Sequence, residues 1–306
     1  MRFSFRNGMT YKPYKNLIEM YPKTYFNHYK FFSRQVASKL FLYLLFTFIL
    51  SAAFSQGNLL VTPKRVVFEG LKRSEELNLA NIGKDSATYD ISFIQIRMKS
   101  DGTVEQISEP DSAQNFADKY LRFFPRTVTL APNEAQTVKV QIIRTAEINP
   151  GEYRSHMYFR AVPNETPLGE KEVKKDSSIS VRIVPIFGIS LPVIIRSGES
   201  TSQVNLSNLS VTDKEKSPTL KMTFNRKGNM SVYGDILVDH ISPEGKVSRV
   251  GIVRGLAVYT PNTSRNFNLA LNAKGLNLSK GKLHVTYSPD QAQKGTKLAE
   301  EYIDLN

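Results

Sequence analysis

The chain has 306 residues, enough for two domains of ordinary size once a targeting segment is set aside. Hydrophobic residues make up 41% of it, which allows packed cores and excludes a disordered chain. The absence of cysteine excludes disulfides, thiolate metal sites and a cysteine nucleophile. The fold must therefore be held together by buried apolar surface, which domains of about 100 residues can supply.

The net charge of +13 is unevenly distributed. Residues 1–55 contain eight of the 41 basic residues but only one of the 28 acidic residues. In the rest of the chain, basic and acidic residues are mixed along the expected strands. Such mixing is typical of a solvated surface and not of a nucleic-acid-binding face, so we expect no nucleic acid partner.

An eleven-residue apolar run, LFLYLLFTFIL, occupies residues 40–50, with basic residues before it and the small-residue stretch SAAFS after it at 51–55. This layout predicts a secretory signal. The run is shorter than the about 20 residues that a membrane-spanning helix needs. Ala53 and Ser55 suit the −3 and −1 positions of a cleavage site, which predicts cleavage before Gln56.

The 39 residues that precede the apolar run are many for the basic part of a signal. Two explanations stay open: translation starts at Met20, or the leader is an uncleaved and slightly extended anchor. In either case residues 56–306 are expected to leave the cytoplasm.

Beyond residue 56 the chain indicates short strands, because apolar and polar residues alternate between turns rich in Gly, Pro, Asn and Asp. The first group of expected strands lies within 59–68, 75–83, 89–98, 130–143, 150–163 and 179–196. A charged loop at 164–175 separates the last two. The number and spacing of these strands favour a β-sandwich.

A polar break, SGESTSQ, covers residues 197–203 and places a domain boundary at about Ser197. Further strands are expected at 204–211, 220–224, 232–239, 247–256, 267–271 and 283–287. We therefore predict an all-β protein with two immunoglobulin-like β-sandwich domains in tandem after an N-terminal signal segment. The leader spans 1–55, the first domain 56–196 and the second domain 197–306.

Residue patterns that carry catalysis or bind a metal are weak. The four histidines lie far apart in the sequence, without metal-ligand spacing. Asp239 and His240, with Ser242 nearby, come closest to a triad, but no nucleophile-elbow glycine pattern accompanies them. We predict that the protein is not an enzyme and needs no cofactor or metal.

Two stretches go beyond a generic β-sandwich. The first is PKRVVFEG at 63–70, followed by EELNLANIG; the second is FFPRTVTLAPNEAQTVKVQII at 123–143, continued by PGEYRSHMYFRAVP. In this order they resemble the PapD-like periplasmic chaperones of the chaperone–usher pilus pathway, and in particular the divergent branch of that family. The resemblance covers about residues 59–196 well, and 197–306 only as a second sandwich.

The resemblance implies a periplasmic, ATP-independent chaperone for pilus or other surface-fibre subunits, with an outer-membrane usher as a possible further partner. A subunit in this family lacks its last strand, and the chaperone donates one of its own to close the open edge. In this chain Ile179, Val181 and Ile183 fall on one face of that donor strand, although packing in their own sandwich stays an alternative. The edge of the same strand could also pair two copies of the chain into a dimer.

The family also holds the subunit's C-terminal carboxylate with two basic residues. Arg65 matches the first, since it stands directly before the VVFEG strand, and a guanidinium pairs well with a carboxylate. Where the family has a lysine, this chain has Ser190. Either Arg182 or Arg196 replaces that lysine, or the anchoring is weaker, or the client differs. Arg196 could instead form a salt bridge at the domain hinge.

A rival interpretation is an envelope or surface immunoglobulin-like module used for adhesion or as a scaffold, without chaperone activity. Resemblance of fold alone does not decide between the two functions. A chaperone should present an exposed, apolar, alternating strand edge beside a basic cleft, whereas an adhesin should not.

Overall fold

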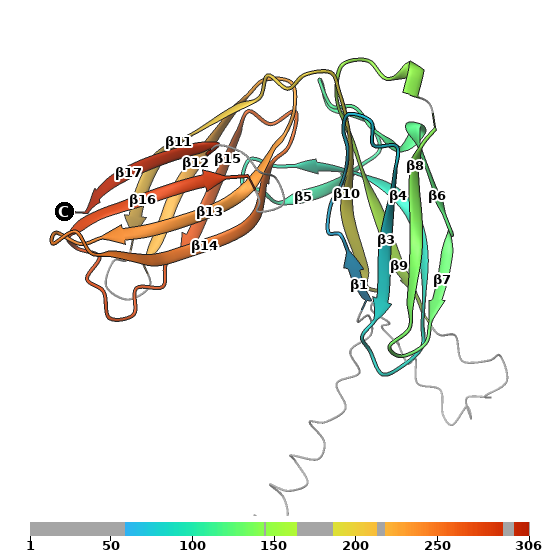
Figure 1. Cartoon of the computed structure of the whole chain (residues 1–306), viewed down its shortest axis with the longest axis horizontal. Coiled ribbons are helices and arrows are strands. Elements are labelled where there is room, and N and C mark those ends of the chain that lie inside the picture. Colours follow the sequence, from blue (N-terminus) through green and yellow to red (C-terminus); the bar gives the residue numbers. More distant parts are fainter. Residues whose placement is uncertain (1–58, 144, 164–185, 213–217, 290–296, 306) are drawn as a thin grey trace, which may run out of the picture. The chain divides into compact units, whose positions relative to one another are not determined.

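The computed structural model describes residues 59–143, 145–163, 186–212, 218–289 and 297–305 (Figure 1). Gln56–Asn306 is one compact unit. The predicted leader, its cleavage site and the charged loop at 164–175 lie outside the described residues. In the part of the chain that the structure describes, no helix is both long enough and apolar enough to cross a bilayer.

The first ten strands form two sheets. One sheet has the order β1 (Leu59–Thr62), β3 (Ser74–Asn81), β8 (Ala135–Ile142) and β6 (Leu121–Phe124). The other has the order β2 (Val66–Phe68), β10 (Gly188–Ser197), β9 (Gly151–Val162), β4 (Ala87–Met98) and β5 (Val104–Ile107), with β7 (Thr127–Leu130) also paired to β4. Two single turns of 3₁₀-helix, η1 (Asp118–Tyr120) and η2 (Thr145–Glu147), connect strands. Only the β2–β10 pair is parallel among these pairings.

The remaining seven strands form a second pair of sheets. These are the three-stranded sheet β11 (Gln203–Thr212), β12 (Thr219–Lys227) and β15 (Ser264–Ala270), and the four-stranded sheet β14 (Val247–Val258), β13 (Val232–Ile241), β16 (Gly281–Ser288) and β17 (Ala299–Leu305). All pairings in both sheets are antiparallel. The strand orders of both sandwiches are those of immunoglobulin-like folds. The predicted fold class is confirmed (Figure 1).

Each sandwich has its own core, built from side chains that alternate along the strands. In the first, Leu77 and Val138 of one sheet pack in a cluster with Met157 and Val193 of the other. In β13, every second residue is buried, beginning with Val232. This alternation is why the period-two pattern located the strands from the sequence.

The boundary predicted near Ser197 falls where β10 ends, and β11 begins at Gln203. It stays a prediction, since Gln56–Asn306 forms one compact unit. A third apolar cluster joins residues of both sandwiches: Met98 and Ile194 pack with Ala257 and Tyr259. The sandwiches are therefore in direct contact.

The hairpin that joins β4 to β5 also reaches the second sandwich. The backbone N–H of Asn266 donates to the carbonyl of Ser100 at 2.7 Å, and Nδ2 of Asn262 donates to the carbonyl of Met98, also at 2.7 Å. β5 was not predicted from the sequence, because the apolar and polar residues of VEQI do not alternate.

Candidate functional site

Arg65 stands directly before β2, whose first residue, Val66, pairs with Val193 of β10. Its guanidinium carbon lies 4.1 Å from the centroid of the Tyr233 ring. All three guanidinium nitrogens are buried, and none has a hydrogen-bond partner among the described residues. Burial lowers the pKa of the guanidinium, an effect that the nearby Tyr259 opposes. Arg65 is thus a cation removed from water without a matching acceptor, which is costly unless a ligand supplies one.

A second arginine, Arg154, and a histidine, His156, lie two residues apart on β9 and therefore face the same side of the sheet. They are only 3% and 6% exposed. The guanidinium of Arg154 lies 4.2 Å from the centroid of the Tyr259 ring, and its Nη2 donates to the carbonyl of Thr260 at 3.0 Å. Its Nε and Nη1 are buried without a partner in the described structure, as is Nδ1 of His156.

The ionisation of these groups follows from burial. Burial lowers the pKa of Arg154. For His156, burial and then the neighbouring positive charge of Arg154 lower the pKa to about 3. The imidazole is therefore neutral at ordinary pH, while arginine keeps its charge. The cluster thus combines two charged donors and one neutral ring.

Glu152 forms a separate network at the same contact between the sandwiches. Its side chain is fully buried and accepts hydrogen bonds from the Ser231 backbone N–H at 2.9 Å, from the Ser231 hydroxyl, and from the Thr260 hydroxyl at 3.3 Å. Arg196 donates from Nε to Glu152 at 3.2 Å and from Nη2 to the Ser231 carbonyl at 2.7 Å. Arg196 thus forms a buried ion pair with Glu152, in agreement with the alternative that it forms a salt bridge. A role in carboxylate anchoring stays a prediction for this residue.

One edge of β10 is partly open. β9 pairs with β10 over its whole length, but on the opposite edge β2 pairs only with the three residues from Val193 to Ile195. Residues 188–192 therefore have no strand on this edge within the described ranges. Phe187 and Ile189 are 50% and 37% exposed, whereas Leu191, on the same face, is 3% exposed and belongs to the core. The apolar side chains on this face of β10 therefore extend beyond the core, and those outside it are exposed to solvent.

Several predicted site residues cannot be located. The donor-strand residues Ile179, Val181 and Ile183, together with Arg182, lie outside the described residues. Ser190 is exposed on β10, opposite Tyr158 of β9.

Arg154 and His156 were not predicted from the sequence as site residues. Their stretch, YRSHMYF, lies in a predicted strand, and the alternation of a strand does not tell whether its second face is solvated or covered. Burial of both faces of β9 requires the second sandwich, which no local pattern encodes. The available signal was the pair of basic side chains at two-residue spacing inside a strand.

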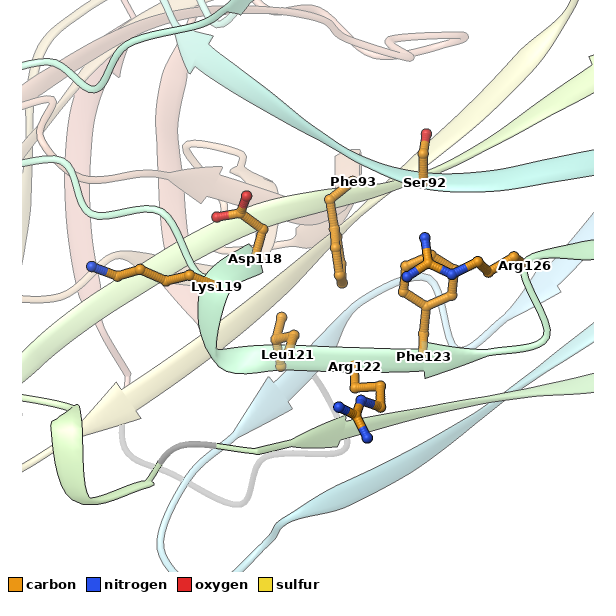
Figure 2. A pocket seen from close by; sticks show the side chains of 8 residues that line it. All are labelled: Ser92, Phe93, Asp118, Lys119, Leu121, Arg122, Phe123 and Arg126. Carbon is orange, nitrogen blue, oxygen red and sulfur yellow. The ribbon is translucent and has the colours of Figure 1, made fainter.

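A separate hollow of about 300 Å³ lies on the first sandwich and is lined by residues from β4, η1, β6 and the turn before β7. The rings of Phe93 and Phe123 meet edge to face at 5.2 Å, and the Arg126 guanidinium lies 5.5 Å from the centroid of the Phe123 ring. Figure 2 shows that the side chains of Lys119 and Arg122 point away from Phe93. Because its cations diverge, the hollow lacks the convergent polar groups of a ligand site.

The weak triad pattern is not assembled. Asp239 pairs with Arg249 at 2.5 Å, while His240, the next residue, is buried with its Nε2 2.9 Å from the carbonyl of Lys280. Successive residues of a strand face opposite sides, which separates the two side chains.

Comparisons with known proteins find similarity to solved structures alone. No protein-family model and no curated protein match the chain. Among solved structures, it is similar to the YadV chaperone (11% identity, TM-score 0.40, covering 81% of this chain and 100% of that one) and to the class 5 fimbriae chaperone CfaA (15%, 0.39, 80% and 98%). It is also similar to the Pseudomonas aeruginosa CupB2 chaperone (12%, 0.38, 80% and 99%). At these identities and scores the likenesses do not establish a family.

Proposed function

We propose that this chain is a divergent PapD-like periplasmic chaperone that caps fibre subunits without ATP. The strand donated to the client includes β10: the C-terminal strand that the incomplete client does possess pairs with the open edge of β10, and Arg65 holds the client's C-terminal carboxylate. The ordered motifs at 63–70 and 123–143 support the family, and the arrangement of β2, β10 and Arg65 supports the mechanism.

The main support for the proposal is the position of β2 relative to the open edge of β10. β2 runs parallel to β10, so the start of β2 borders the open residues 188–192. A client strand on that edge lies in line with β2. If it also runs parallel to β10, its C-terminal end arrives at Arg65. A guanidinium attracts a terminal carboxylate and repels a terminal ammonium, which selects the parallel direction.

Side chains along the edge supply the apolar part of the contact. Phe187 and Ile189 are exposed and project on the face that Leu191 buries in the core. A strand that adds to a sheet edge gains affinity from main-chain hydrogen bonds and specificity from alternate side chains. The proposed donor-strand residues Ile179, Val181 and Ile183 stand at odd positions, as Phe187 and Ile189 do. If the donor strand includes them without a bulge, their side chains would share one face with Phe187 and Ile189.

The proposal includes export, since the signal pattern at 40–55 precedes the sandwiches. It also includes an outer-membrane usher as a partner that receives the client. A second copy of the chain is an alternative occupant of the β10 edge, because an open edge invites pairing. No enzymatic step is involved.

The test is capture of candidate subunits, taken from the small β-rich proteins encoded beside the gene. Each is co-expressed with the chaperone, and the complex is measured by size-exclusion chromatography. We expect Ile189→Asp to abolish capture, since it places an unpaired charge against an apolar groove. Ile252→Asp, at an exposed apolar position of β14, is the matched control and should capture normally.

A second arm tests the carboxylate. A client lengthened by a Gly-Ser tail keeps its strand but displaces its terminal carboxylate, so its capture should weaken. Equal capture by Ile189→Asp and Ile252→Asp would contradict the proposal. It would favour the rival function, an immunoglobulin-like adhesion or scaffold module.

A further inference from the structure

We propose that Arg65, Arg154 and His156 form a single oxyanion site in which Arg154 supplies the second cation for the client's carboxylate. This inference rests on the proposed function and extends it, because it assigns the second basic group to β9 and not to the donor strand. It also predicts that small oxyanions such as sulfate occupy the same site when no client is bound.

The geometry of the two arginines leaves most of their buried donors without acceptors among the described residues. Each guanidinium lies against a tyrosine ring, Arg65 on Tyr233 and Arg154 on Tyr259. Stacking uses the face of a guanidinium, whereas its N–H groups lie in the plane. Nε, Nη1 and Nη2 of Arg65 and Nε and Nη1 of Arg154 are buried without acceptors in the described structure. Five guanidinium nitrogens thus have no hydrogen-bond acceptor among the described residues.

The nearest carboxylate cannot serve these donors. Glu152 already accepts from Ser231, Thr260 and Arg196. When Arg196 of the Glu152 network is counted with Arg65 and Arg154, three arginine charges face one buried carboxylate among the described residues. A buried cation without an acceptor is strongly unfavourable, so an anion that enters here is held tightly.

Arg226 also approaches the network but has its own acceptors. Its Nε donates to Asn262 at 2.8 Å, and its Nη1 donates to the carbonyls of Gly228 and Met230 at 2.8 and 2.9 Å. Arg226 is therefore a buried arginine of the same chain whose N–H donors have acceptors. Arg65 has none of these bonds, and Arg154 has one.

The chemistry of the donors defines the ligand class. Two guanidiniums match the planar, two-oxygen geometry of a carboxylate and also the oxygens of sulfate or phosphate. His156 adds a neutral ring nitrogen, Nδ1, on the same side of β9. In its Nδ1–H tautomer this ring donates a hydrogen bond to an oxygen without adding charge.

The first experiment uses sodium sulfate and no client. Thermal unfolding is followed in sulfate and in chloride at equal ionic strength, since a ligand that binds only the folded state raises the melting temperature. We expect sulfate to stabilise the natural protein, and Arg65→Met or Arg154→Met to remove that gain. Methionine keeps a long apolar stem and removes the donors. Arg254→Met, at an exposed position of β14, is the matched control and should keep the gain.

The second experiment uses N-acetylglycine as a minimal C-terminal carboxylate and N-acetylglycinamide as its uncharged control. N-Acetylglycine should stabilise the natural protein and compete with sulfate, and the amide should do neither. Arg154→Met should weaken binding at least tenfold, with Arg154→Lys in between. His156→Asn, which retains an N–H donor, should bind more tightly than His156→Phe.

The outcomes separate the two proposals. If neither anion stabilises the natural protein more than chloride does, the oxyanion site is wrong even where clients are captured. If Arg154→Met captures clients as well as the natural protein does, its anchoring role is wrong, whatever sulfate does. If both anions bind through Arg154 but no client depends on Ile189, the site stands and the chaperone function fails.

Discussion

The guanidinium carbon of Arg65, directly before β2 in the first sandwich, lies over the ring of Tyr233 on β13 in the second sandwich, 4.1 Å from its centroid. The arrangement fixes the orientation of the arginine while leaving its nitrogens without acceptors among the described residues. A long side chain normally loses rotamer freedom when it binds. Here the stacking has already restricted it, so less entropy is lost when an anion arrives.

Arg65→Ala should abolish client binding and leave the fold intact. Truncating one partner of a desolvated charge pair costs about 2–5 kcal/mol of affinity, so the dissociation constant should rise about 30-fold or more. Affinity is measured by titration with a purified client, and folding by circular dichroism. Recovery of clients at the natural yield would contradict carboxylate anchoring.

Ile189→Asp and Leu191→Asp form a matched pair on one face of β10. Ile189 lies beyond the core, so its substitution should leave the melting temperature nearly unchanged while capture is lost. Leu191 is buried in the core, so a charge there should unfold the first sandwich. A collapse of Ile189→Asp in thermal melts would mean that the residue serves its own sandwich and not a partner.

Glu152→Ala should destabilise the protein by about 3–5 kcal/mol, because it leaves Arg196 buried without its counter-ion. The control is Asp239→Ala, which breaks the more exposed ion pair with Arg249 and should cost less than about 1 kcal/mol. Urea unfolding measures both free energies. Equal effects of the two substitutions would show that the Glu152 network adds little to the contact between the sandwiches.

Acid should weaken the fold through His156. Its pKa in the folded state is about 3, below the ordinary value of 6.5, so the unfolded chain takes up the proton first as the pH falls. The contribution of His156 to the free energy of unfolding is therefore fully present above pH 6.5 and is lost as the pH falls from 6.5 to 3. The loss is about 2 kcal/mol at pH 5. Urea unfolding at pH 7.5 and 5.0 measures the loss.

The control variant for this pH dependence is His156→Gln, which cannot take up the proton and should show a flatter profile than the natural protein. His284→Gln, which removes a half-buried histidine paired with Glu300, should keep the loss. Identical profiles for the two variants would mean that another group titrates.

The N-terminus of the exported protein should begin at or near Gln56. The apolar run and the Ala53–Phe54–Ser55 pattern predict this cleavage. N-terminal sequencing of protein from envelope fractions tests it. An intact leader retained in the inner membrane would refute cleavage and leave export standing.

The sequence by itself determined the class of fold, because strands with one buried face repeat every two residues and such repeats can be read locally. The core positions Val138 and Val140 on β8 were located in this way. Arg65 could be singled out as well, since its place before a short strand belongs to an ordered set of motifs.

Only the tertiary structure decided which polar residues leave water. Arg154 and His156 occupy the alternate positions of β9 that a single sandwich exposes, and the second sandwich buries them beside Tyr259. Tyr259 lies more than 100 residues further along the chain. The period of a strand records which residues share a face. It carries no information about what covers that face, because covering it depends on contacts between segments distant in sequence.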